Sequence, residues 1–273
     1  MDKQKDPQIT PNDLLKAENA FLKLKLGLEH GMQMEESSTL SPEIENQWLK
    51  SVYAFEQQYK DAKRIKVYDY IGRPPFTKWH RLDARKIRQE LERLRSVMSR
   101  NSIELDSICE YDDATIYRFV TEELFEHEMD DMRIPGMTCH YTYEEFHPNH
   151  DYDLRRETTD FLNSLFTKVW NEDYDAISLA NNVAFRGKEH SRKSVSSIVT
   201  AFQEVHRPLQ IKTLDITDVT IHSGLINANV RASVDICGEM KSGEAVRYTG
   251  VCSFSFIRDD NFWQISGFFV PGF

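Results

Sequence analysis

The feature that most restricts the fold of this chain is a change of periodicity near residue 209. From there on, apolar residues alternate with polar ones, which is the spacing of strands that have one buried face. Connections rich in Gly, Ser, Asp and Asn separate the runs, so an antiparallel meander is the economical topology. The four strand-like runs are LQIKTLDITDVTIH, LINANVRASVDIC, EAVRYTGVCSFSFIRD and FWQISGFFV.

The residues just before this sheet have helical spacing. Apolar residues recur every three or four positions over 154–170 and again over 194–206, and Pro208 ends the second of these predicted helices. A short helical piece is expected at 174–179, and a brief strand or loop at 184–190. Helices followed by strands indicate an α+β domain whose helices pack on one face of the sheet.

The first half of the chain is predicted to be helical. Thr10 with Pro11 and Ser41 with Pro42 are typical of helix starts, and Gly31 is typical of a helix end. Two further helices are expected at 83–99 and 113–132. We therefore predict three parts, with the bounds 1–137 for a helical N-terminal region, 138–151 for a connecting segment and 152–273 for the α+β domain.

Histidines and carboxylates cluster around the predicted connection. Glu123 and His127 are four apart on the predicted fourth helix, and EEFHPNHDYD adds His147 and His150. A 2-His-carboxylate metal site can be drawn from these histidines with Glu123 or Asp151. Asp, Asn, Pro and His are also ordinary turn residues, and a polar connection between two domains is the favoured interpretation.

Charge and composition exclude several classes of protein. The formal net charge is −10 and the pI is near 5.4, so nucleic acid is a poor partner. No run is apolar enough to span a membrane, the N-terminus has no apolar signal core, and the four cysteines form no CxxC pair. We therefore expect a cytoplasmic protein with reduced thiols. P-loop and GxGxxG motifs are lacking, so we expect no nucleotide or other cofactor, and without a GxSxG motif nothing indicates a nucleophilic serine.

The C-terminal part resembles the NTF2-like superfamily, including its SnoaL-like members. The resemblance covers about residues 152–273 and depends on the element order and on the closing strands YTGVCSFSFIRDDNFWQISGF. It implies a curved sheet wrapped around helices to form a cone with a pocket. The superfamily includes isomerases, dehydratases, cyclases, scaffolds and transport factors, so fold alone selects no activity. The matching residues are Phe161, Trp170, Tyr174, Phe202, Phe254, Phe256, Trp263 and Ile265. The helical first half resembles no characterised family.

Strand alternation assigns residues to the two faces of the predicted sheet. Residues 230, 232, 234 and 236 share an apolar face, whereas Arg231, Ser233 and Asp235 share a polar one. One interpretation places the polar face in solvent or in a dimer interface. The other turns it into a cavity, where Asp235 would act as a general base and Arg231 would hold an anion. The ligand-pocket candidates are Tyr248, Cys252, Phe254, Phe256 and Trp263.

These observations give one leading function and two alternatives. The leading hypothesis is a non-catalytic protein that binds a small apolar ligand or acts as a scaffold, forming a homodimer through the outer sheet face. The helical region would offer a surface for a protein partner. The first alternative is a small-molecule lyase or isomerase with a base in the cone. The second is a metal site at the domain junction, with His127, His147 and His150 as candidate ligands.

Overall fold

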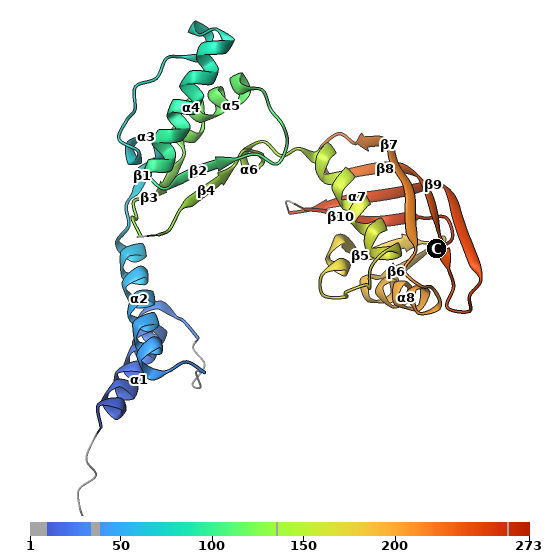
Figure 1. The fold of residues 1–273 in the computed structure, drawn as a ribbon, viewed down its shortest axis with the longest axis horizontal. Helices are drawn as coiled ribbons and strands as arrows, with labels where there is room; N and C mark the ends of the chain where they lie inside the picture. Colours follow the sequence, from blue (N-terminus) through green and yellow to red (C-terminus); the bar gives the residue numbers. More distant parts are fainter. Residues whose placement is uncertain (1–9, 34–38, 135, 261) are drawn as a thin grey trace, which may run out of the picture. The chain divides into compact units, whose positions relative to one another are not determined.

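The structure is a computed structural model that describes residues 10–33, 39–134, 136–260 and 262–273. The chain divides into two compact units, Met1–His147 and Pro148–Phe273 (Figure 1). The fold is α+β, as predicted. Within the described ranges, none of the helices combines the length and the apolar character that a membrane span requires.

The first unit begins with two helices that pack on each other, α1 (Pro11–His30) and α2 (Pro42–Asp61). Their predicted starts are confirmed, because the side chains of Thr10 and Ser41 accept hydrogen bonds from main-chain amides of the first turn. Gly31 ends α1 in the left-handed conformation with φ of 69°.

A polar pair fixes the register of these two helices. Asn46 Nδ2 donates to Asn19 Oδ1 at 2.8 Å, and both side chains are buried. Leu26 and Leu49 are fully buried in the same contact. An amide pair inside an apolar contact is satisfied in one register only, so it specifies how α1 and α2 meet.

The rest of the first unit has its own core, made of helices and two small sheets. Ile87, Leu91, Leu94 and Met98 of α4 are buried in it, as the spacing predicts. In the sheets, β1 pairs with β3 antiparallel and β2 pairs with β4 parallel. The elements are β1 (Arg64–Lys66), α3 (Val67–Tyr70), η1 (Trp79–Arg81), α4 (Ala84–Arg100), β2 (Ile103–Asp106), α5 (Asp113–Glu122), η2 (Leu124–Glu126), β3 (Glu128–Asp130), β4 (Cys139–Thr142) and α6 (Tyr143–Phe146).

The fourth predicted helix is shorter than expected. The spacing predicts a helix over 113–132, but α5 ends at Glu122. Leu124 and Phe125 remain buried in a 3₁₀ turn, and the following residues form β3, whose main chain pairs with β1. Pairing with a distant strand therefore replaces the last turns of the helix, and local spacing does not show this.

The segment predicted as a connection, 138–151, is shared between the two units. Residues 139–142 form β4, and Tyr141 and Tyr143 are buried in the first unit. His150 is already the first residue of α7, the first helix of the second unit. The boundary between the units lies at His147 and Pro148.

The second unit has the predicted element order. A helix and a short 3₁₀ turn come first, a hairpin and a second helix follow, and four long strands end the chain. The elements are α7 (His150–Phe166), η3 (Asp175–Ser178), β5 (Leu179–Phe185), β6 (Lys188–Ser191), α8 (Arg192–Val205), β7 (Gln210–Ile221), β8 (Asn227–Glu239), β9 (Ala245–Asp259) and β10 (Phe262–Phe269).

The sheet of the second unit has six strands in the order β6-β5-β10-β9-β8-β7. The predicted antiparallel meander is confirmed for β7 to β10. The early hairpin adds to it differently, because β5 pairs parallel with β10. Arg186 and Gly187, with φ of 50° and 73°, turn β5 into β6.

One face of this sheet carries the core of the second unit. The residues of β8 that point to the helices are 0–4% exposed, and α7 lies across the sheet (Figure 1). Register shifts interrupt β7 at two places and β10 between Ile265 and Gly267. Such bulges bend strands, and they increase the curvature of the sheet around α7.

Candidate functional site

The five candidate pocket residues of the cone lie on its inner face. Cys252, Phe254, Phe256 and Trp263 are at most 5% exposed, and Tyr248 packs against the same core. Their alternation along β9 and β10 follows the two-residue period of a strand. The sequence therefore assigned these side chains to the face that packs on the helices.

Aromatic side chains of the second unit occupy the interior of the cone. The Phe268 ring lies 5.0 Å from Phe161, 4.8 Å from Phe185 and 5.9 Å from Phe273, measured between ring centroids. Phe254 stacks on it at 6.3 Å. All five rings are at most 7% exposed. These rings therefore pack on one another inside the cone.

His206, which was not among the predicted site residues, hydrogen-bonds to the hydroxyl of Tyr248. His206 Nδ1 lies 2.8 Å from the Phe202 carbonyl, which can only accept, so Nδ1 carries the proton. His206 Nε2 is then an acceptor for the Tyr248 hydroxyl at 2.9 Å. Burial raises the pKa of Tyr248. Gly272 packs closely against the same ring: a Cβ at this position would stand 2.3 Å from carbon atoms of the Tyr248 ring, so a larger residue does not fit.

The two candidate catalytic residues lie on the other face of the sheet. Asp235 accepts two hydrogen bonds from Arg247, at 2.9 Å from Nε and 2.7 Å from Nη2. This pair lowers the pKa of Asp235. Arg231, which shares a strand face with Asp235, is exposed and does not supply its ion pair. The partner comes from β9 because facing side chains of adjacent strands are closer than residues two apart on one strand.

The histidines drawn as metal ligands have different contacts in the structure. His147 Nε2 lies 2.8 Å from Glu123 Oε2, whereas the His127 ring packs edge-on against Phe146. His150 belongs to the second unit, where its Nδ1 accepts from Trp263 Nε1 at 3.3 Å. Desolvation and the nearby Arg258 lower the pKa of His150. Across the described part of the chain, no three His, Cys, Asp or Glu side chains are grouped to hold a metal ion.

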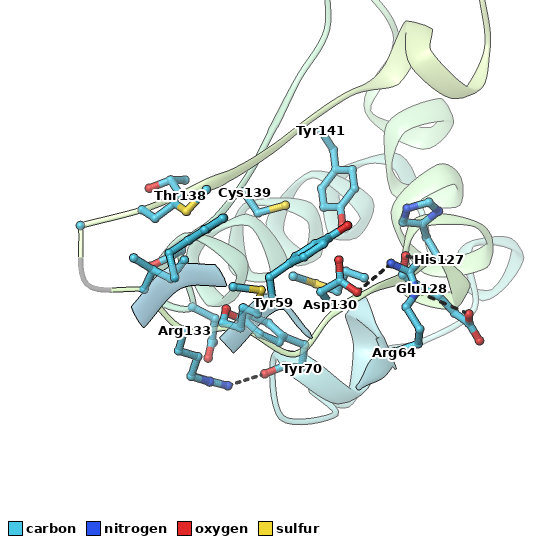
Figure 2. A pocket seen from close by; sticks show the side chains of 18 of the residues that line it. Tyr59, Arg64, Tyr70, His127, Glu128, Asp130, Arg133, Thr138, Cys139 and Tyr141 are labelled. Atoms are coloured by element: carbon cyan, nitrogen blue, oxygen red, sulfur yellow. Dashed lines mark hydrogen bonds and ion pairs between the residues drawn. The ribbon is translucent and has the colours of Figure 1, made fainter. Parts of the chain in front are cut away.

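The first unit contains a pocket of about 620 Å³ that the sequence did not indicate (Figure 2). It lies where the end of α2, the β1–β3 pair and the loop before β4 meet. Its volume falls within the range of small-molecule sites, about 300–1,000 Å³. The lining residues include Tyr59, Tyr70, Tyr141, three methionines, Cys139 and three arginines.

Long-range pairing of main chains builds this pocket. The antiparallel pairing of Arg64 with Asp130 brings residues 64 and 127–130 together, and the parallel pairing of Ile103 with Cys139 brings 100–102 to 138–141. Burial raises the pKa of Tyr141, with a contribution from its hydrogen bond to Cys139. These contacts join segments that are tens of residues apart, so no local spacing could have shown them.

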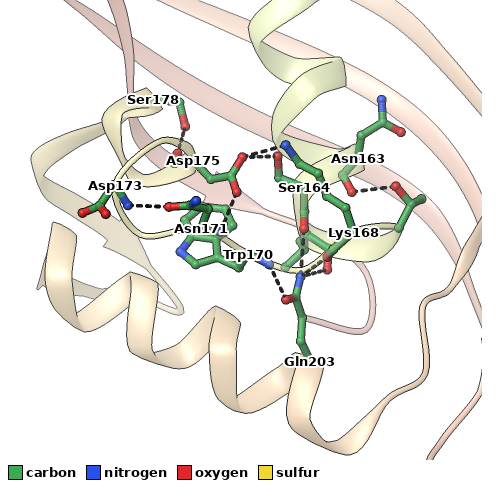
Figure 3. Close-up of polar contacts among 11 residues, drawn as sticks. Asn163, Ser164, Lys168, Trp170, Asn171, Asp173, Asp175, Ser178 and Gln203 are labelled. Atoms are coloured by element: carbon green, nitrogen blue, oxygen red, sulfur yellow. Dashed lines mark hydrogen bonds and ion pairs between the residues drawn. The ribbon is translucent and has the colours of Figure 1, made fainter. Parts of the chain in front are cut away.

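A polar cluster at the end of α7 serves the fold of the second unit (Figure 3). Gln203 Nε2 donates to the carbonyls of Ser164, Leu165 and Lys168 at 2.8–3.0 Å, and its Oε1 accepts from the Trp170 amide at 2.8 Å. Ser164 and Leu165 belong to the last turn of α7, where helical partners run out, and Lys168 lies just after the helix. One side chain of α8 therefore terminates α7 and positions the following turn.

An aspartate completes this cluster. Asp175 accepts from Ser164 Oγ at 2.7 Å, from the Asn171 amide at 2.7 Å and from Lys168 Nζ at 2.9 Å. Burial alone would raise the pKa of Asp175, but these donors outweigh burial and lower it. The carboxylate is fully engaged in structural contacts, so we assign it no role in binding or catalysis.

Comparison with known proteins found solved structures that are similar to part of the chain. No family model and no curated protein matches the chain. Solved structures of NTF2-like proteins do match, each over less than half of it, and the N-terminal region is not matched. The solved structures that are similar to this part of the chain are NTF2-like and SnoaL-like proteins, which agrees with the resemblance predicted for residues 152–273.

Three of these structures illustrate the likeness. A conserved protein from Planctomyces limnophilus is 14% identical over 45% of this chain and 97% of its own, with a TM-score of 0.37. A hexachlorocyclohexane dehydrochlorinase is 11% identical over 45% and 86%, with a TM-score of 0.37. A protein assigned as an NTF2-like dehydratase from Streptomyces avermitilis is 16% identical over 44% and 95%, with a TM-score of 0.35.

Proposed function

We propose that this protein is a non-catalytic binding protein that holds a small, largely apolar molecule in the pocket of its first unit. The observation that carries the proposal is the pocket itself, about 620 Å³ in volume, whose walls combine aromatic and methionine side chains with charged and polar ones. Methionine side chains adapt to ligands of different shape, and aromatic walls provide large apolar contact areas.

The state of the cone supports a non-catalytic function. Five buried phenylalanine rings pack together in its interior, and both ring nitrogens of His206 have hydrogen-bond partners. The alternative, a lyase or isomerase with a base in the cone, relied on Asp235. That carboxylate lies on the outer face, in an ion pair with Arg247.

Calorimetric titration of the full chain with 2-naphthamide tests the proposal. This neutral aromatic probe should bind with one-to-one stoichiometry. Tyr59 lines the pocket and is 58% exposed, so Tyr59→Ala removes part of a wall without opening a core. We expect about tenfold weaker binding in this variant, which corresponds to ~1.4 kcal/mol.

Tyr174→Ala is the matched control. Tyr174 is 77% exposed and belongs to the second unit, and it does not line the pocket. Its replacement should leave the affinity unchanged. Equal weakening in both variants would contradict the proposal.

A second candidate function, self-association as a scaffold, is favoured by α1. The side of α1 away from α2 carries Leu14, Phe21, Leu24 and Leu28, which are 60–78% exposed. With Ala17 they are spaced alternately by three and four residues, which is the seam of a coiled coil. We propose that a second copy of the chain covers this seam.

The charges beside the seam suit a second, antiparallel copy. Glu18 and Lys25 flank it on the same side, where within one copy Glu18 pairs with Lys50 at 2.8 Å and Lys25 lies over the Tyr53 ring at 4.1 Å, so these contacts would have to be shared with the second copy. When Phe21 of one copy faces Leu24 of the other, each Glu18 comes within about half a helical turn of the opposite Lys25. The α1 seam of a second copy would therefore offer an apolar surface and charges of opposite sign to those beside the first seam.

Sedimentation velocity of three chains tests this self-association. The wild-type chain should sediment as a dimer and Leu24→Glu as a monomer. Val251→Glu is the informative control, because Val251 is 56% exposed on the outer face of the sheet, where the sequence placed the dimer interface. Dissociation by Val251→Glu, with Leu24→Glu still dimeric, would refute the seam in favour of the sheet.

A further inference from the structure

We infer that the pocket of the first unit selects an anionic molecule, an aromatic or apolar body with a carboxylate or similar oxyanion, and that Arg133 holds the anionic group together with Arg100. This inference rests on the proposed function and names the class of ligand for the same pocket.

The charges that line the pocket are unevenly distributed. Three arginines and two carboxylates line it, in a chain whose formal net charge is −10. Both carboxylates are used by one arginine, because Arg64 lies 3.2 Å from Asp130 Oδ1 and 3.9 Å from Glu128 Oε2. The positive charge that remains unneutralised in the pocket therefore belongs to the other two arginines.

Arg133 is held in place without using a carboxylate. Its Nη2 donates to the Tyr70 carbonyl at 2.9 Å, and the guanidinium lies over the Tyr70 ring at 4.6 Å (Figure 2). Stacking and one hydrogen bond orient the planar group, and four of its five N–H donors remain for another acceptor. A carboxylate takes two parallel hydrogen bonds from such a group.

Arg100 is the second arginine without an acidic partner among the described residues. Its Nε donates to the Ser96 carbonyl at 3.0 Å, one turn back in α4. A basic residue in the last turn is favourable for any helix, and this alone would explain its position. Arg100 also lines the pocket, so its positive charge attracts an anion there in addition to stabilising the helix end.

A pair of isosteric probes separates this inference from the proposed function. The full chain is titrated with 2-naphthoate and with 2-naphthamide at pH 7.5, where one is an anion and the other is neutral. The wild-type chain should bind the carboxylate about tenfold tighter than the amide. Added salt should weaken binding of the carboxylate alone.

Variants assign the preference to particular residues. Arg133→Gln should reduce the carboxylate preference to threefold or less, and the double change with Arg100→Gln should abolish it, at a ratio of about one. Arg88→Gln is the control, because Arg88 is exposed on α4 and outside the pocket. The ratio of the two affinities cancels any general loosening of the pocket by a substitution.

The possible outcomes separate the anion preference, its assignment to the two arginines and the binding function itself. Equal binding of the two probes to the wild-type chain overturns the anion preference and leaves the binding function standing. A preference that survives in the double variant overturns the assignment to Arg133 and Arg100. Failure of both probes to bind overturns the proposed function and the inference together.

Discussion

Removal of the Phe268 ring tests whether the cone of the second unit is a packed core. Phe268 is 7% exposed and lies against the rings of Phe161, Phe185, Phe254 and Phe273 at 4.8–6.3 Å between centroids. Phe268→Ala deletes the centre of this cluster. The neighbouring rings are themselves fixed by α7 and the sheet, so they cannot collapse fully into the space.

The structure gives the size of the expected effect. Phenylalanine to alanine changes in packed cores cost about 3–5 kcal/mol of unfolding free energy, and four ring contacts place this site in the upper half of that range. Phe269 is the matched control, because it is the next residue on β10 but is 59% exposed. Its change to alanine should cost less than about 1 kcal/mol.

Denaturant unfolding followed by tryptophan fluorescence measures both variants. Trp170 and Trp263, both in the second unit, are at most 7% exposed, whereas Trp48 and Trp79 of the first unit are much more exposed. The change in emission therefore reports mainly on the second unit. Equal costs for Phe268→Ala and Phe269→Ala would refute the packed cone and would restore a ligand cavity in its place.

The other predictions concern single side chains of the second unit. Gln203→Leu removes the partner of two carbonyls of α7, of the Lys168 carbonyl and of the Trp170 amide, and should cost about 2–3 kcal/mol in denaturant unfolding; a cost near zero would contradict its role. The pKa of Asp175 is lowered on folding, so its contribution to stability is present above the unfolded-state value of about 3.9 and is lost as the pH falls through the folded-state value. Asp175→Asn should therefore flatten the acid limb of the stability profile, and an unchanged limb would exclude this carboxylate. Burial raises the pKa of Cys252 to about 12, so a thiol reagent should label it only in denaturant, and labelling of the native chain would show that β9 opens.

Local patterns were sufficient to predict most of the second unit. The two-residue alternation of β8 and β9 identified their buried faces, and the turn residues between strands identified the meander. Capping residues such as Thr10 and Ser41 gave the starts of α1 and α2 correctly. In each case the cause lies within a few residues of the effect, so the sequence displays it directly.

The errors arise where distant segments pair. The β1–β3 pairing shortened α5, and the β2–β4 pairing placed residues 139–146 in the first unit. The same pairings build the pocket, so the proposed site was absent from the predicted candidates. Likewise, Asp235 takes Arg247 of the adjacent strand rather than Arg231 of its own, because pairing partners are fixed by register.

The most direct test of the account is a map of amide chemical shifts in the full chain during titration with 2-naphthoate. Changes in chemical shift should concentrate in the first unit, at amides of residues that line the pocket, such as Ser102, Arg133 and Cys139. Amides of the inner face of β8 and β10, such as Ala232 and Gly267, should remain unshifted. Shifts centred on that inner face, with the first unit unaffected, would place the ligand in the cone and contradict the account.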